Sequence, residues 1–302
     1  MPAIARTSAF PNSTTLRGIH HVVFQSWAQR ESVGDSIFRE MNSSQVREHV
    51  LTMGGGSQFS VKAEGAPINY GTLNEGFLST FTYVDYADGF RITRRMYTND
   101  LYGSMEKHGS ELGRMAHSTK EQLRADHFNN GFDTNYPIAD GAALFSTSHI
   151  LEDGSTWRNR PSVDADLSDT SLKQGIIDFR LFTDGGGKKL QIKPVCLLTA
   201  TANLFVAPEL IESELTPEND TNAKNSLRSH KLQHKVWDYL EDTDAWFLLA
   251  DKSDHELQVF NREDFWTEHI FDFDTKDVKY SGMFAESSGA ADARGVYGSQ
   301  GA

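Results

Sequence analysis

The spacing of apolar side chains between Thr98 and Gly131 predicts one long amphipathic helix. Apolar residues recur at nearly helical intervals, and these residues are Leu101, Tyr102, Met105, Leu112, Met115, Ala116 and Leu123. The opposite face carries mainly Glu, Lys, Arg and Ser. Thr98 or Asn99 can cap the first turn, and the Asn-Asn-Gly ending at Gly131 can stop the last one. Such a helix is far longer than the usual about 11–12 residues.

Three glycines interrupt this predicted helix, and they are Gly103, Gly109 and Gly113. Each lowers helix stability by up to about 1 kcal/mol relative to alanine. The helix therefore needs packing partners along its length.

Residues 51–97 carry the pattern of strands. MGGGSQ, from Met53, has the composition of a flexible joint, and QFSVKAEG alternates with Phe59, Val61 and Ala63 on one side. A turn-rich stretch follows, and FLSTFTYVDYADGFRITRRM then predicts at least one long strand. We expect an extended two-stranded excursion with a polar tip. A lone hairpin is marginal in water, so this one should rest on a partner.

A compact α+β unit is expected from about residue 166 to residue 260. DTSLKQGIIDFRLF, from Asp169, predicts a helix, and a buried strand follows at Lys193–Leu198. TANLFVAPELIES predicts a helix that Pro208 kinks or restarts. HKVWDYL, AWFLLAD and LQVFNR then predict a meander of short strands.

The two ends of the chain have weaker patterns. We expect a short strand at His20–Phe24 and a broken helix at Gln25–Arg39, within an arm that leans on something else. Near the other end, Val278–Phe284 predicts a strand. The tail Asp292–Ala302 contains an Arg and a Tyr among small residues. Terminal segments are often disordered, but these two residues suggest that this one packs against another part of the structure.

Charge and composition narrow the class of protein. The 302 residues carry a formal net charge of −13 and are 38% hydrophobic. A sequence-reading nucleic-acid binder is normally basic, so that class is disfavoured. No apolar run is long enough to cross a membrane, no signal peptide is evident, and the lone Cys196 excludes an intramolecular disulfide. Synthesis in a reducing cytoplasm fits these features.

No candidate site stands out for catalysis, cofactor binding or metal binding. His149 and Asp153 are close in the sequence, but the pattern His-x-x-x-Asp is not characteristic of any catalytic site. A histidine that is hydrogen-bonded within a loop is the simpler interpretation. Three aspartates lie in predicted loops, and they are Asp242, Asp244 and Asp251. Their sequence lacks the glycine and the terminal glutamate of an EF-hand calcium-binding loop. His20 and His21 are adjacent, so their side chains diverge and do not form a metal-binding pair. The segment MGGGS lacks the Lys-Ser/Thr of a phosphate-binding loop. We therefore expect no enzyme, no cofactor and no metal.

Several strings, in their order and spacing, resemble the major capsid proteins of tailed bacteriophages. They are YVDYADGFRITRRMYTNDLYG, ADGAALFSTSHI, NRPSVDADLSD, DTDAWFLLAD and the terminal DARGVYGSQGA. The most similar branch is the Mu-like major head subunit. The resemblance covers the chain from about residue 50 to its end. It implies an α+β, HK97-like capsid fold.

The resemblance also implies a division of the chain. It comprises an N-terminal arm (1–54), an extended loop (55–93), a peripheral domain with the spine helix (94–165), an axial domain (166–260), and a return to the peripheral domain with the C-terminal tail (261–302). The implied function is self-assembly, as hexamers and pentamers, into the icosahedral head shell that encloses double-stranded DNA without sequence-specific binding. Assembly would occur in the bacterial cytoplasm, and portal, scaffold and decoration proteins are the implied partners.

Other interpretations stay open. An encapsulin-like nanocompartment shell would share the fold but hold cargo enzyme in place of DNA. A soluble α+β hydrolase would be a compact monomer or dimer that depends on His149 or Asp153. Some capsid relatives cross-link a Lys to an Asn. Lys62 lies in the predicted loop, but the sequence shows no accompanying acid and Asn pattern.

Overall fold

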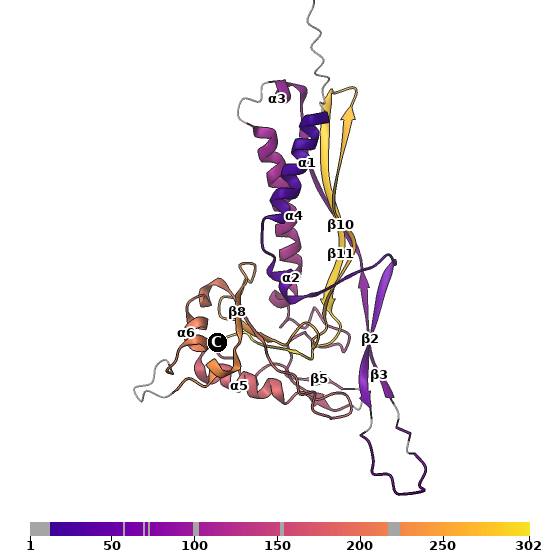
Figure 1. Ribbon diagram of the computed structural model, residues 1–302, viewed down its shortest axis with the longest axis vertical. Coiled ribbons are helices and arrows are strands. Elements are labelled where there is room, and N and C mark those ends of the chain that lie inside the picture. The colour runs from indigo at the N-terminus through magenta and orange to yellow at the C-terminus, as the bar shows by residue number, and fades with distance from the viewer. Residues whose placement is uncertain are drawn as a thin grey trace, which may run out of the picture.

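The computed structural model describes residues 13–56, 58–68, 70–71, 73–98, 103–151, 154–216 and 224–302. The molecule is elongated, and two helices and a long sheet run along its long axis (Figure 1). A compact unit lies at one end, where a hairpin also projects. The long sheet has the strand order β1-β10-β11-β4. Its strands are β1 (Arg39–Asn42), β4 (Val84–Ile92), β10 (Leu257–Asp272) and β11 (Asp277–Ala290).

The predicted long helix is present as α4 (Ser104–Asn129), but its start was predicted wrongly. Thr98 ends a separate short helix, α3 (Arg94–Thr98), and Gly103 precedes α4 with φ 64°. That left-handed backbone is unfavourable for residues with a Cβ, so the glycine marks the boundary. Asn99, Leu101 and Tyr102 lie outside the described residues. Met105 and Leu112 are buried as expected, whereas Met115 is exposed.

The glycines of α4 permit a close crossing with α1 (Ser13–Ala28). A Cβ at Gly113 would overlap Ser26 Oγ and the Val23 carbonyl, and one at Gly109 would lie 3.3 Å from Ile19 Cγ2. The predicted strand at His20–Phe24 is therefore wrong. Buried Ile19 and Val23 are four residues apart, and they form the helical stripe that faces α4.

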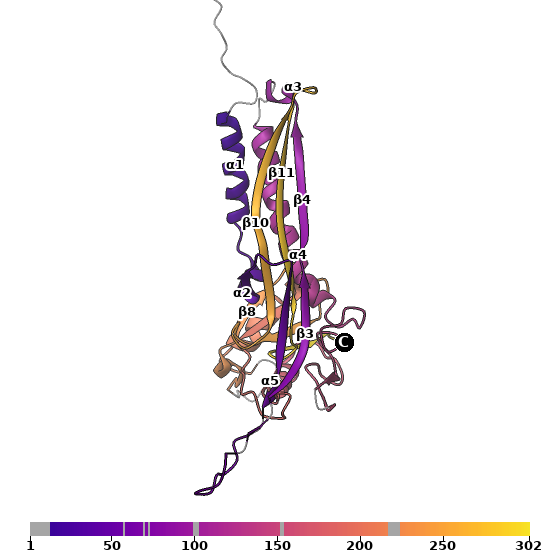
Figure 2. The same cartoon turned by 90° about the vertical axis from the view of Figure 1, so that its right-hand side faces the viewer.

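The broken helix predicted at Gln25–Arg39 is confirmed in outline. It consists of the end of α1 and of α2 (Val33–Ile37), which is capped by Ser32. Figure 2 shows α1 on one side of α4 and β4 on the other. α2 lies at the foot of α4, beside the compact unit.

The two-stranded excursion is confirmed, but its strands differ from the prediction. It pairs β2 (Arg47–Gly56) with β3 (Leu73–Thr82) and projects beyond the body (Figures 1 and 2). The supposed joint Met53–Gly56 is part of β2, whereas Phe59, Val61 and Ala63 belong to no strand. The segment predicted to hold at least one long strand holds two, which are separated at Tyr83, with β3 in the hairpin and β4 in the long sheet.

The compact unit contains a second sheet of order β12-β9-β7-β8, flanked by helices. Its strands are β7 (Cys196–Thr199), β8 (Gln233–Val236), β9 (Trp246–Leu249) and β12 (Val296–Ser299). Its helices are α5 (Asp169–Arg180), η1 (Thr201–Asn203), α6 (Val206–Glu212) and η2 (Leu227–His230). α5 begins at Asp169, as predicted, and Ser168 caps it. Pro208 lies in the first turn of α6, where its missing N–H costs little.

The predicted meander is wrong. β8 pairs in parallel with β7, and β10 leaves the unit for the long sheet. The tail does dock, but β12 pairs with β9 in the compact unit rather than returning to the long sheet. The alternation of apolar and polar residues predicts that a segment is a strand, but it does not predict which strand it pairs with. A short hairpin, β5 (His149–Ile150) with β6 (Thr156–Trp157), lies in the connection between the two sheets.

Replacing Gly113 by alanine should destabilise the subunit, although alanine favours helix by about 1 kcal/mol. The new Cβ has no room between α4 and α1, so α1 must shift. Gly18→Ala, on the open side of α1, is the matched control, because its Cβ meets nothing within 4 Å. Thermal unfolding should show a lower Tm for Gly113→Ala and an equal or higher Tm for Gly18→Ala. Equal behaviour of the two variants would contradict the close crossing.

Candidate functional site

His149 is a structural residue in this fold. Its ring is buried, with Nδ1 2.6 Å from Asp140 Oδ2 and Nε2 2.9 Å from Asn159 Oδ1. Both nitrogens are therefore occupied, and neither can act on a substrate. The expectation of a hydrogen-bonded loop histidine is confirmed. Asp153, its suggested partner, lies outside the described residues.

The three loop aspartates do not converge on a metal site. Asp242 accepts a hydrogen bond from the Asp244 N–H at 3.1 Å, and Asp251 accepts one from the Ser253 N–H at 3.1 Å, so both stabilise turns. Among the described ranges, no three His, Cys, Asp or Glu residues gather closely enough to hold a metal ion. Burial raises the pKa of Cys196 to about 11, so this thiol is a poor nucleophile. No helix in the described part of the chain is long and apolar enough to span a bilayer.

The most conspicuous surface is the tip of the projecting hairpin, residues 58–71. Phe59 and Val61 have relative exposures of 108% and 101%, and Ile68 and Tyr70 are also exposed. Lys62 lies between these apolar side chains and is exposed as well. Burying a large apolar side chain contributes about 1.5–3 kcal/mol, so the tip gains stability only against another surface.

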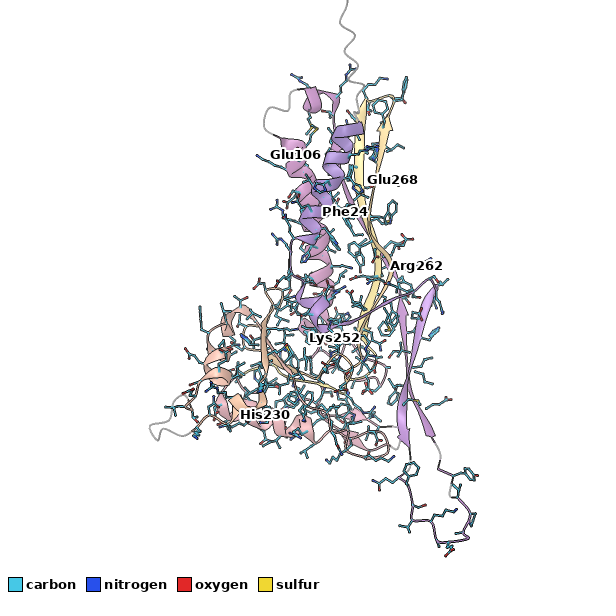
Figure 3. The ribbon with its side chains drawn as sticks, viewed as in Figure 1. Phe24, Glu106, His230, Lys252, Arg262 and Glu268 are labelled. Atoms are coloured by element: carbon cyan, nitrogen blue, oxygen red, sulfur yellow. The ribbon has the colours of Figure 1, made fainter. Side chains whose placement is uncertain are left out.

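A second exposed surface is the outer face of the long sheet. Trp266 of β10 pairs with Met283 of β11, which pairs with Ala87 of β4. In the same way, Ile270 pairs with Lys279, and Lys279 with Arg91. Ile270 is 64% exposed, and Trp266 is partly exposed. Figure 3 shows Arg262 and Glu268 along the same strand, away from the helices. The helices α1 and α4 pack on the other face of the sheet, against Phe265, Tyr280 and Phe284.

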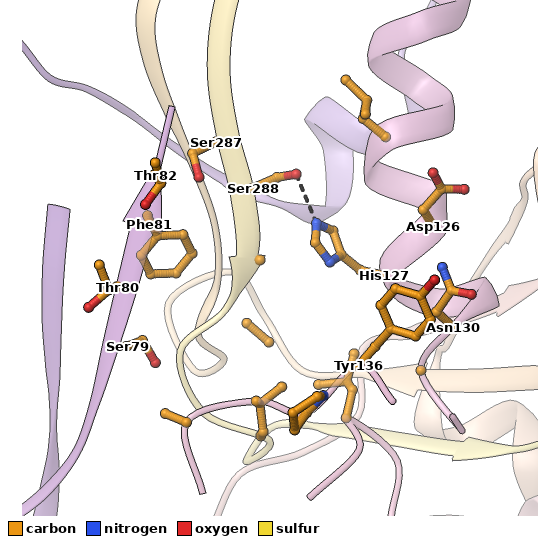
Figure 4. Close-up of a pocket in the computed structure, with 18 of the residues that line it drawn as sticks. Ser79, Thr80, Phe81, Thr82, Asp126, His127, Asn130, Tyr136, Ser287 and Ser288 are labelled. Carbon is orange, nitrogen blue, oxygen red and sulfur yellow. Dashed lines mark hydrogen bonds between the residues drawn. The ribbon is translucent and has the colours of Figure 1, made fainter. Parts of the chain in front are cut away.

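A groove of about 840 Å³ runs between β3, β11 and the end of α4. In Figure 4, Phe81 of β3 lies on one side of the groove, and His127, Asn130 and Tyr136 lie on the other. His127 Nε2 lies 2.8 Å from Ser288 Oγ. Burial lowers the pKa of His127 to about 4, so the ring is neutral at pH 7.

A cluster of charged residues joins the elements of the subunit at the foot of α4. Arg124 has 0% exposure and binds Asp35 of α2 and, at 2.8 Å, Glu40 of β1. Its Nη2 lies 3.6 Å from Glu286 of β11. Lys120 approaches the same Glu286 carboxylate at 3.4 Å. Arg124 thus connects the N-terminal segment to the long sheet.

Glu121, one turn earlier on α4, connects the compact unit. Its carboxylate accepts hydrogen bonds from Trp237 Nε1 at 2.8 Å and from the Gly34 N–H at 3.2 Å. Ser32 Oγ donates to the other oxygen. A Cβ at Gly34 would lie 2.6 Å from Arg124 Cδ, so only glycine fits there.

The sequence reasoning missed this cluster. At about 3.6 residues per turn, Arg124 lies about 80° around the helix from Ala116 and about 120° from Leu112, so it is at the edge of the predicted apolar face and not on it. Nothing in the local sequence identifies Asp35, Glu40 or Glu286 as its partners.

The family model of a phage capsid protein matches residues 79–299. The major capsid protein of Escherichia phage Mu is 31% identical over 109 residues, which are 36% of this chain and 35% of the Mu protein. The match thus spans about a third of the Mu protein. It agrees with the resemblance stated from the sequence.

Solved structures with little sequence similarity share the fold. The capsid structure of Cyanophage P-SCSP1u is similar with a TM-score of 0.60 and 8% identity, over 89% of this chain and 88% of that one. The virus-like particle of Pyrococcus furiosus gives a TM-score of 0.54 at 7% identity, over 94% and 98% of the two chains. At these identities the similarity concerns the fold alone.

The low pKa of His127 predicts a loss of stability in acid. The unfolded chain takes up the proton near pH 6.5 and the folded chain near pH 4, so stability falls as the pH drops through that window. Across that window the slope should reach about 1.4 kcal/mol per pH unit for this group. His127→Gln should flatten the decline, measured by urea unfolding at several pH values. The exposed His21→Gln is the control, and equal slopes for the two variants would contradict the assignment.

Proposed function

Because the chain belongs to the phage capsid protein family and has the α+β, HK97-like fold, we propose that it is the major capsid protein of a tailed bacteriophage. In this role it self-assembles into the icosahedral head shell and encloses the double-stranded DNA genome. The hairpin tip supports this most directly, because its fully exposed Phe59 and Val61 would otherwise gain no burial. A subunit with such a tip is completed by its neighbours.

The proposal assigns a role to each part of the subunit. The hairpin and its tip lie across an adjacent subunit in a hexamer or pentamer. The helix α4 and the long sheet form the peripheral domain. The compact unit, with β12 added to the predicted 166–260, surrounds the centre of the capsomer. A subunit surface used head-to-tail in this way closes into rings.

The energetics suit a shell made of many weak contacts. Each buried apolar side chain of the tip contributes about 1.5–3 kcal/mol, and every subunit repeats the contact. Each subunit carries a net charge of −13, and like charges repel, so the shell should not bind the DNA tightly. The protein then acts as a container in the virion and has no enzymatic role. Assembly in the bacterial cytoplasm, with portal, scaffold and decoration proteins as partners, is part of the same proposal.

A nanocompartment shell is the second candidate. The similarity to the Pyrococcus furiosus virus-like particle concerns the fold, which both candidates share. The content of purified particles distinguishes the two functions. Nuclease-protected DNA supports the phage head, whereas a cargo enzyme supports the compartment. A soluble hydrolase has no support from His149, since both of its ring nitrogens are occupied.

Removing the hairpin tip should abolish shell closure without unfolding the subunit. We would replace residues 57–72 by an Asn-Gly turn, which suits a two-residue hairpin. Circular dichroism and thermal unfolding should match the unaltered protein, and electron microscopy should show no closed particles. Closed particles of normal size from this variant would contradict the role of the tip.

Point substitutions test the same contact more gently. Phe59→Ser combined with Val61→Thr should weaken assembly, because the lost apolar burial is worth roughly 3 kcal/mol per subunit. Ser60→Thr, between them, is the matched control and should assemble normally. Light scattering against protein concentration measures the difference, and equal assembly thresholds would contradict the contact.

A further inference from the structure

The hairpin of β2 and β3 is bent by a bulge in its ladder. Its pairing shifts register between Leu51 and Met53 and again between Met53 and Gly56. At the first shift, Thr52 Oγ1 accepts a hydrogen bond from the Phe77 N–H at 2.9 Å and donates one to the Phe77 carbonyl at 3.1 Å. A bulge bends its strand and increases the local twist. The hairpin therefore consists of two parts that meet at Thr52.

The part of the hairpin nearest the long sheet is fixed by contacts with that sheet. Phe81 of β3 is buried, and its ring centroid lies 5.0 Å from that of Phe260 of β10. Ser79 Oγ donates a hydrogen bond to the carbonyl of Ala291, directly after β11, at 3.2 Å. These contacts fix the hairpin as far as the bulge. The direction of the part beyond the bulge depends on what that part touches.

The part beyond the bulge touches a turn of the compact unit, residues 184–188, which comes after α5 in the chain. Figure 1 shows this part of the hairpin beside the compact unit. Gly55 has a φ of 83°, and a Cβ there would lie 2.8 Å from the Gly186 nitrogen and 2.9 Å from Asp184 Oδ2. A Cβ at Gly186 would lie 3.2 Å from the Gly56 carbonyl oxygen. The two segments therefore meet backbone to backbone, and a side chain has no room between them.

The turn is held in one shape by its own hydrogen bonds. The Asp184 N–H donates to the Lys188 carbonyl at 2.8 Å. Asp184 Oδ1 accepts hydrogen bonds from the N–H groups of Gly186 and Lys188, at 3.0 and 2.8 Å. Just before the turn, the Thr183 carbonyl accepts a hydrogen bond from Arg294 Nε at 3.2 Å. The turn is therefore a preformed surface that belongs to the compact unit and not to the hairpin.

We propose that this contact is a clasp through which the compact unit sets the direction of the hairpin tip, residues 58–71. The clasp comprises Gly55 and Gly56 of the hairpin and residues 184–186 of the turn. From Thr52 at the bulge to Gly55 at the clasp, the strand covers about 10 Å at about 3.3 Å per residue. The far end of the tip lies up to about 30 Å beyond the clasp. A shift of about 1 Å at the clasp therefore moves the far end by up to about 4 Å.

The clasp assigns a role to two glycine runs, residues 54–56 and 185–187. The first run has the composition of a flexible joint, but its last two residues lie against the turn. The run therefore permits a close contact, and the tip and the compact unit change position together. The inference concerns the single subunit and does not depend on the proposed function. In a shell, the clasp would set where the tip meets its neighbour.

The distance between two nitroxide labels on the full-length subunit, measured by electron paramagnetic resonance, tests the proposal. One label is attached at Ser60→Cys in the exposed tip, and the other at His230→Cys in the compact unit (Figure 3). Cys196 is buried and burial raises its pKa to about 11, so it should stay unlabelled. An excess of unlabelled subunit removes the distances between subunits, whether or not shells form.

Three substitutions separate the clasp from local backbone strain. In Gly55→Ala the segments must part by about 0.7 Å to reach a normal contact of about 3.5 Å, so the mean label distance should shift by up to about 3 Å. Gly186→Val adds bulk at the clasp without a left-handed backbone, and it should shift the distance as well. Gly187→Ala is the matched control. Its φ of 75° gives it a backbone strain similar to that of Gly55→Ala, but its Cβ meets nothing within 4 Å, so the distance should stay unchanged.

An unchanged distance in Gly55→Ala and Gly186→Val would overturn the clasp. Equal shifts in Gly55→Ala and Gly187→Ala, with none in Gly186→Val, would also overturn it, because local strain then explains them. If circular dichroism shows that Gly55→Ala does not fold, the comparison of Gly186→Val with Gly187→Ala decides the question. Particle imaging of the unlabelled protein reports separately on shell assembly, so a failure of the clasp is distinguishable from a failure of the proposed function.

Discussion

The buried guanidinium of Arg124 is the interaction on which the rest of the subunit depends. With 0% exposure it must keep its charge among carboxylates, and those come from α2, β1 and β11. Removing one partner from such a set typically costs about 3–5 kcal/mol, because a charge is left buried and unpaired. The arm, the helix and the long sheet are therefore fixed together at one point, and Glu121 adds the compact unit through Trp237.

This fixed frame explains how the exposed parts can serve assembly. The hairpin projects from the frame, with its apolar tip at the far end (Figure 1). The outer face of the long sheet and the groove beside β3 share the strand β11. Self-association of this kind needs surfaces held in place before contact, because ordering them on binding would cost affinity.

Local patterns in the sequence predicted the elements better than their partners. Periodicity identified α4 and α5, although the cap predicted for α4 was wrong. Alternation identified several strands, but the alternating Phe59, Val61 and Ala63 belong to none. The strand predicted at His20–Phe24 was wrong because this segment is part of the helix α1. Its apolar residues pack against α4, where glycines leave room for the close contact. The partners of β8, β10 and β12 lie far away in sequence, so alternation alone could not assign them. The Arg124 cluster was missed for the same reason, whereas the expected hydrogen-bonded role of His149 was correct because it needed only nearby loop residues.

Sedimentation velocity of the purified protein, combined with electron microscopy, tests the central claim most directly. The account predicts capsomers or closed shells of megadalton mass for the unaltered chain, and only smaller species when residues 57–72 are replaced by a turn. A homogeneous 33.8 kDa monomer at every concentration, with no particles in the images, would contradict it.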